Sequence, residues 1–212
     1  WGDILLPYAV CGMLAFSLRR LAPEPLAAAA LLLFLASHGL EMVGDLASIA
    51  AENRVLAGHG APAEVAEQTA MMGRIATSIT ADMQVLHAPF LEAVRIRLTT
   101  APFLPLANLG ATFFETFPLM LLGMALVRLG LFTGEWEDGN LRRMALFGIC
   151  VGGSISAALI GWAAIRGFPP AMMFALMGSL AAIPHLAMTL GYLAALLLLY
   201  PRLKDTSTGQ RL

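Results

Sequence analysis

Residues 26–51 read LAAAALLLFLASHGLEMVGDLASIAA. The first eleven of these residues are apolar, and three ionisable side chains, His38, Glu41 and Asp45, follow at spacings of three and four. Because an α-helix turns by about 100° per residue, these three side chains fall on one narrow helical face. The sequence therefore predicts one helix with an apolar body and a single ionisable stripe.

The composition places the chain among membrane proteins. Of its 212 residues, 58% are hydrophobic and 13% are charged, whereas a soluble domain is about 25% charged. The net charge of −1 provides no bulk attraction for nucleic acid, so no nucleic-acid partner is expected. Cys11 and Cys150 lie in apolar runs without the spacing of a disulfide framework or a zinc site, and both are expected to be buried thiols. No metal site is predicted.

Long apolar runs predict an all-α, polytopic transmembrane helix bundle. A spanning helix needs roughly 20 mainly apolar residues, and about five segments approach that length, although the first is short. The candidate spans are residues 4–18, 25–50, 104–129, 141–165 and 171–200. We treat residues 1–212 as one transmembrane domain. In the fourth span, Gly148 and Gly152 form a GxxxG pattern, which favours close packing of helices.

The interval between spans two and three, residues 51–100, is predicted to be a helical insertion outside the hydrocarbon. A loop signal at residues 58–62 precedes two helical segments, 63–79 and 82–98, and the second is broken near Pro89. One apolar face of the second segment consists of Phe90, Leu91, Val94 and Leu98. This pattern fits an amphipathic helix at the membrane interface, and an ordinary extramembrane helix fits it equally well. Arg95 and Arg97 are candidates for contact with an anionic group, of which lipid phosphate is the simplest.

The short loops predict the orientation of the bundle. Of the 13 Lys and Arg residues, the side of the first short turn receives those at positions 19, 20, 128, 142, 143, 202, 204 and 211, and the short loop on the opposite side receives position 166. Basic residues in short loops favour the cytoplasmic side. This argument places residues 51–100 in the periplasm or outside the cell, and the ionisable stripe in the outer half of its helix.

Ionisable groups at membrane depth are the candidate site residues. Each charge costs about 2.5–3.5 kcal/mol at the centre of a bilayer, so such groups usually face protein or water. At about 1.5 Å per residue, His38 and Glu41 are predicted to be buried and Asp45 to lie at the outer edge. Glu115 lies in mid-span without a basic residue in its own helix, so it either is protonated or pairs across helices, and His38 is one partner to consider. His185 is the remaining mid-span histidine, although a purely structural histidine is the alternative.

The four candidates for a polar cavity or a proton relay are therefore His38, Glu41, Glu115 and His185. A wholly interfacial polar face is the alternative reading of the stripe, if its helix leaves the hydrocarbon near Ser37. The chain contains no phosphate-binding loop, nucleophile elbow or zinc-protease motif.

Several segments in order resemble one bacterial family. They are WGDIL at residues 1–5 with Tyr8-Ala9 and Gly12, FLE at 90–92 with Arg97-Leu98, LLGMAL at 121–126 with RLGL at 128–131, and LGYLA at 190–194. This series is similar to the YeiB-like integral membrane proteins, a family of largely unknown function. That family is related to transmembrane acyltransferases, including the heparan-glucosaminide N-acetyltransferase-like group.

The resemblance implies a multi-helix bundle in the bacterial cytoplasmic (inner) membrane that moves an acyl group from a cytoplasmic donor, such as acyl-CoA, to a small-molecule acceptor. It also implies that the chain is the middle of a longer polypeptide, with the key Asp and His of the related enzymes upstream, so no catalytic residue is assigned here. A proton-coupled transporter or permease and a non-catalytic membrane scaffold are the alternative hypotheses. Membrane lipids are expected partners, and a homo-oligomer is a further possible assembly.

Overall fold

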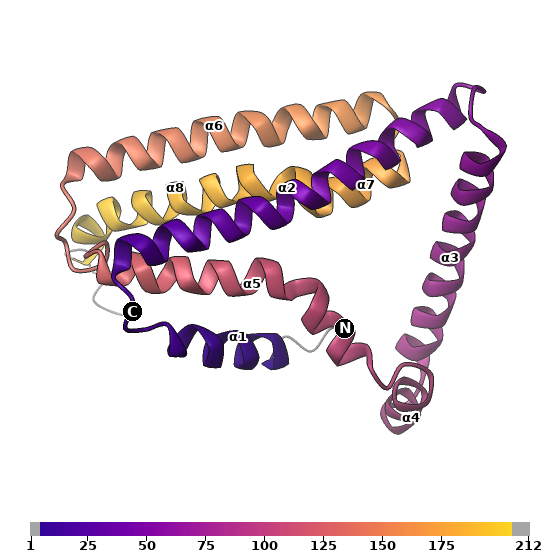
Figure 1. Ribbon diagram of the computed structural model, residues 1–212, viewed down its shortest axis with the longest axis horizontal. Coiled ribbons are helices and arrows are strands. Elements are labelled where there is room, and N and C mark those ends of the chain that lie inside the picture. The colour runs from indigo at the N-terminus through magenta and orange to yellow at the C-terminus, as the bar shows by residue number, and fades with distance from the viewer. Residues whose placement is uncertain (1–4, 205–212) are drawn as a thin grey trace.

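The computed structural model describes residues 5–204, and the regular elements in that range are all α-helices (Figure 1). In chain order they are α1 (Leu5–Ser17), α2 (Pro23–Leu56), α3 (Pro62–His87), α4 (Phe90–Thr100), α5 (Leu104–Arg128), α6 (Asp138–Ile165), α7 (Pro170–Met177) and α8 (Ser179–Lys204). The predicted all-α fold is confirmed. Trp1 to Ile4 of the family-like opening and Arg211 of the orientation argument lie outside the described residues.

Helix α2 lies at the centre of the bundle. It packs against α5 on one side and against α7 and α8 on the other, while α1 covers α5 and α6 covers α8. Four segments are long and apolar enough to cross a membrane: α2, α5, α6, and α7 together with α8. Helix α1 has 13 residues and is the shorter apolar helix at the edge of the bundle. The chain is therefore a membrane-type helical bundle organised around α2.

The core depends on small residues where α6 meets α8. Gly148 and Gly152 of the predicted GxxxG pattern face α8, and a Cβ atom built on Gly191 would lie 2.8 Å from the backbone nitrogen of Ile149. Without side chains at these positions, the two backbones approach closely and gain van der Waals contact. The pattern thus serves packing within the chain. Cys11 is buried as predicted, but Cys150 is exposed because it lies on a face of α6 that the described helices do not cover.

Three element boundaries differ from the sequence-based prediction. Helix α3 continues to His87, so residues 82–87 belong to it and not to the second predicted segment. Helix α2 runs on to Leu56, so the first residues of the 51–100 interval continue the span. The fifth span is not one helix, because it is interrupted at Gly178, whose φ of −110° and ψ of −111° end α7 before α8 begins. Apolar periodicity is the same on both sides of Gly178, so the interruption left no signal in the hydropathy pattern.

The ends of the bundle are held by side chains that bond to backbone. At the end predicted to be cytoplasmic, the Arg128 guanidinium donates to the carbonyl oxygens of Arg19 (3.1 Å) and Leu21 (2.5 Å). This contact places the first short turn beside the end of α5, at one end of the bundle. At the opposite end, Arg166 donates to the Asn53 side chain at 2.7 Å and links the α6–α7 loop to α2.

An ion pair closes the corner between α2 and α3, and its stability should depend on pH. Arg54 Nε donates to Glu64 at 3.0 Å, and the Ala61 backbone N–H donates to the same carboxylate at 3.0 Å. The hydrogen bond from Arg54, followed by that from Ala61, lowers the pKa of the Glu64 carboxyl. Because the folded pKa is depressed, the stabilisation is complete above the ordinary glutamate pKa of about 4.3 and is lost as the pH falls through the lower folded value.

We therefore expect amide hydrogen exchange at residues 57–64, corrected for its intrinsic rate, to be constant from about pH 8 to pH 5 and to accelerate below about pH 4. A Glu64→Gln variant should exchange faster at neutral pH and show no such acceleration. The same pH profile in both proteins would contradict a role for this carboxylate.

Candidate functional site: a polar cavity between three helices

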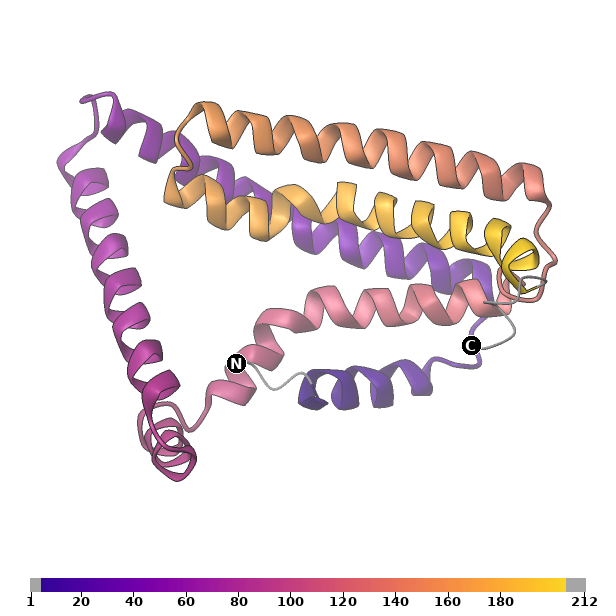
Figure 2. The same ribbon diagram turned by 180° about the vertical axis from the view of Figure 1, so that it is seen from behind.

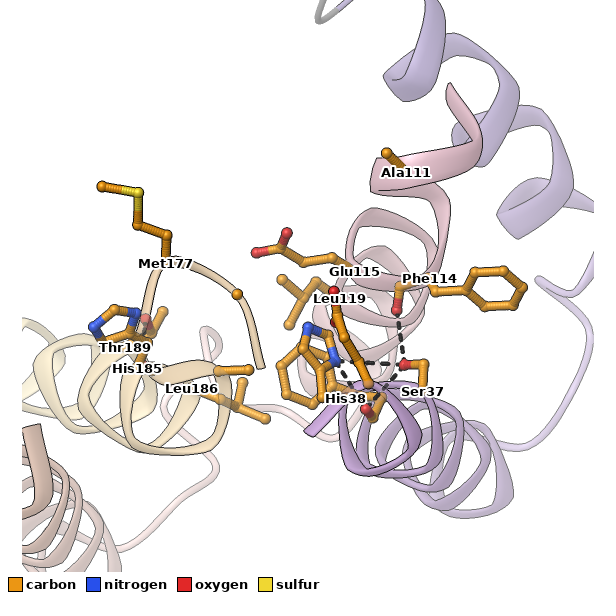
Figure 3. A pocket seen from close by; sticks show the side chains of 14 residues that line it. Ser37, His38, Ala111, Phe114, Glu115, Leu119, Met177, His185, Leu186 and Thr189 are labelled. Atoms are coloured by element: carbon orange, nitrogen blue, oxygen red, sulfur yellow. Dashed lines mark hydrogen bonds between the residues drawn. The ribbon is translucent and has the colours of Figure 1, made fainter. Parts of the chain in front are cut away.

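A cavity of 320 Å³ opens between α2, α5 and the junction of α7 with α8 (Figure 3). It contains all four ionisable residues singled out in the sequence. Its lining residues are Phe34, Ser37, His38, Glu41, Ala111, Phe114, Glu115, Leu119, Met177, Gly178, Ala182, His185, Leu186 and Thr189. Helices α5 and α8 both pack on α2 but not on each other among the described residues, which leaves the space that forms the cavity.

His38 forms the floor of this cavity, and its ring has a defined orientation. The side chain is 7% exposed, and Nδ1 lies 3.0 Å from the carbonyl oxygen of Phe34 one turn earlier. A carbonyl oxygen only accepts, so Nδ1 carries the proton, and the lone pair of the neutral imidazole is on Nε2. The Phe34 ring packs on the imidazole with centroids 4.2 Å apart. Figure 3 shows the other ring nitrogen directed toward the side of the cavity where Glu115 lies.

Two carboxylates enter the cavity without partners in the described part of the chain. Glu115 projects from α5 into the space facing Met177 (Figure 3), and neither Glu115 nor Glu41 has a hydrogen bond or ion pair with another described residue. Glu41 points toward the interrupted span, because a Cβ atom added to Gly178 would lie 3.7 Å from its Oε1. The cavity therefore presents one oriented imidazole and two carboxylates with free oxygen atoms, which can hold a proton or a polar ligand.

His185 lines the cavity from α8 and lies across it from His38 in Figure 3. Like Glu41 and Glu115 it is exposed, whereas His38 is buried. The backbone carbonyl of His185 accepts a hydrogen bond from the Thr189 hydroxyl at 2.8 Å. The structure thus brings all four candidates around one space, with His185 on the α8 side of it.

Asp45 and Glu52 have partners that sequence reasoning did not foresee. The prediction placed Asp45 at the outer edge of the membrane, but it is half-buried and accepts a hydrogen bond of 2.5 Å from Ser179, at the start of α8. Glu52 is 2% exposed, and its Oε1 accepts from Gln68 of α3 at 2.8 Å and from the Ala171 backbone N–H of α7 at 3.1 Å. Both carboxylates lie near helix N-termini, where the helix dipole favours negative charge. Their spacing of seven on α2 is the signal that could have indicated one shared face.

The two arginines proposed for anionic contacts lie far from this cavity. Arg95 donates to Glu92 in its own helix at 2.8 Å, and Arg97 donates to Asp82 of α3 at 3.4 Å. The anionic groups that they contact here are carboxylates of the same chain. In the described range there is no cluster of three or more His, Cys, Asp or Glu residues arranged to hold a metal ion.

The sequence from residue 126 to residue 212 matches the profile of a family described as Protein of unknown function (DUF418). This segment, which is less than half of the chain, is similar to the DUF418 family. DUF418 is also called YeiB-like, so the match agrees with the family expected from the sequence. Of the cavity, the DUF418 match covers the residues from α7 and α8, whereas those from α2 and α5 precede it. No curated protein and no solved structure matches the chain.

Proposed function

We propose that this protein is an acyltransferase of the bacterial inner membrane and that His38 is its general base. The acyl donor is a thioester such as acyl-CoA, and the acceptor is a small molecule with a hydroxyl or amino group that binds in the cavity. One observation carries this proposal: the Phe34 carbonyl holds Nδ1–H, so the free lone pair of His38 faces a polar cavity. An oriented, neutral imidazole is the usual base for activating such acceptors.

The proposed reaction needs only the His38 imidazole, the acceptor and the thioester donor. The acceptor O–H or N–H gives its proton to Nε2 of His38 as its oxygen or nitrogen attacks the acyl carbonyl carbon. The carbon–sulfur bond then breaks, and the departing thiolate takes the proton back from the imidazolium. The carboxylate of Glu115 stabilises the transient imidazolium by its negative charge. The His38 ring is buried and packs on the Phe34 ring, which limits the contact of bulk water with the base.

The test uses the full-length protein purified in lipid nanodiscs. Radiolabelled acyl-CoA thioesters of several chain lengths are added with a mixture of hydroxyl- and amine-bearing acceptors, and the label is followed into product and into free acid. We expect transfer or slow hydrolysis for at least one chain length. Absence of both across all chain lengths would overturn the proposal.

Proton-coupled transport is a second candidate, and the interruption at Gly178 favours it. Carriers bind their substrates near discontinuous helices at mid-membrane depth, and here Glu41 faces such a break beside the cavity. In this mechanism Glu115 carries the coupled proton, because carboxylates within spanning helices that line a cavity commonly form proton relays.

We expect Glu115→Gln to abolish proton-driven uptake in reconstituted vesicles, measured with an imposed pH gradient, while the exposed loop variant Glu137→Gln retains it. The uptake screen uses amino acids, sugars and nucleosides as trial substrates. Coupling that is unchanged by Glu115→Gln would remove this carboxylate from the transport mechanism.

A further inference from the structure

We propose that α4 lies at the interface between lipid and water on the outer side of the membrane that the bundle spans. Its apolar face anchors it there, without binding to anionic lipid. The first support is its direction. In Figures 1 and 2 the bundle helices run across the picture, whereas α4 is seen nearly end-on in both views, and α3 crosses the end of the bundle. Because the long axes of the spanning helices follow the membrane normal, α4 runs roughly parallel to the membrane plane.

The second support is the place of α4 in the fold. Among the described helices it packs against α3 alone, and α3 packs against α2 and α4 alone. Only residues 101–103 separate α4 from α5, which is one of the candidate spans. A helix tethered this closely to the start of a span cannot move far from the membrane surface.

The third support is the exposed apolar face. Phe90 is 80% exposed, Leu91 79% and Leu98 67%, and these residues share one side of α4. Farther along the chain, Phe103 is 73% exposed and Leu106, in the first turn of α5, is 59% exposed. Since the surface of a spanning helix that no other helix covers contacts lipid, an apolar face that lies this close to it in the chain is best occupied by the acyl chains of the same leaflet.

The charges of α4 determine the kind of lipid contact. The Arg95 guanidinium makes two hydrogen bonds to Glu92, and Arg97 reaches Asp82. Hydrogen bonding to Arg95 lowers the pKa of the Glu92 carboxyl, so this pair remains ionised at neutral pH. Each arginine is therefore balanced within the chain. The anchoring free energy comes from burial of apolar surface, and it should not require the headgroup phosphates of anionic lipids.

The experiment measures the depth of spin labels in vesicles. Cysteine is introduced as Leu91→Cys, Leu98→Cys or Thr99→Cys in a background with Cys11→Ala and Cys150→Ser, and each nitroxide is tested with oxygen and with a water-soluble nickel complex. Thr99 is the matched control, because it is an exposed residue directly opposite Phe90 on α4, on the polar side that carries Glu92 and Arg95. Vesicles are made of phosphatidylcholine alone or with phosphatidylglycerol.

We expect the labels at positions 91 and 98 to be several-fold more accessible to oxygen than to nickel, the label at 99 to show the reverse, and both patterns to be the same in the two lipid mixtures. Labels at 91 and 98 that resemble the label at 99 would overturn the interfacial position. Protection from both reagents would show that protein, such as a second copy, covers the face. Insertion only with phosphatidylglycerol would show that charge provides the anchoring.

Discussion

The substitution Gly148→Leu is expected to separate α6 from α8 and to produce the largest loss of stability in this protein. A Cβ atom on Gly148 would lie 2.8 Å from the Cα of Gly191 and closer still to the carbonyl oxygen of Ala187. Both neighbours are backbone atoms, so they cannot rotate away as a side chain can. The helices must move apart, and neighbouring contacts between α6 and α8 are lost with them.

Overpacking of a filled core costs about 1–3 kcal/mol, and a backbone collision belongs at the upper end of that range. For a chain of this size, about 3 kcal/mol corresponds to a fall of roughly 6–12 °C in melting temperature. The measurement is a thermal unfolding curve in detergent, made in a Cys150→Ser background because Cys150 is exposed, and followed with a thiol-reactive dye that reports exposure of the buried Cys11.

The matched control is Gly153→Leu, because Gly153 is on the same helix and a Cβ atom there has nothing within 4 Å. It also removes a helical glycine, so the loss of backbone flexibility is the same in both variants. We expect the control to melt within about 2 °C of the unmodified protein. Equal melting temperatures for the two variants would show that α6 and α8 do not meet through Gly148.

The substitution His38→Asn is expected to have the largest effect on activity. The side-chain amide of asparagine places an N–H where Nδ1–H of histidine lies, so it keeps the bond to the Phe34 carbonyl. It has no basic nitrogen at the position of Nε2. General base catalysis contributes about 10²–10⁴-fold to a rate, so the rate of acyl transfer should fall by that factor while the protein remains folded.

His185→Asn is the control, since His185 lines the same cavity from α8, across from His38. The rate of label transfer should change less than about threefold in this variant, a change well below that expected for loss of a base. The apparent affinity for the acyl donor should be similar in both variants, because the proposal assigns His38 to the chemical step. Equal rates for His38→Asn and the unmodified protein would remove His38 from the reaction.

Much of the fold was accessible from the sequence because it depends on local patterns. Long apolar runs predicted the spanning helices, and a helical period relates His38 to Glu41 regardless of what surrounds them. The same reasoning singled out Glu115, since a lone carboxylate in an apolar run is costly wherever that run is placed. Glu52 was missed for the opposite reason. It lies in an interval predicted to be outside the hydrocarbon, where a carboxylate carries no cost of burial and is therefore not singled out.

The amino-acid pattern alone was sufficient for the membrane class, the helices and the ionisable residues on each of them, because hydropathy and helical period are properties of neighbouring residues. Which helices face one another was settled by packing in three dimensions. The cavity exists because α5 and α8 both contact α2 but not each other, and α7 stops at Gly178 opposite Glu41. Contacts between residues more than a hundred positions apart, such as Asp45 with Ser179, arise from the fit of whole helix surfaces, which no local pattern encodes.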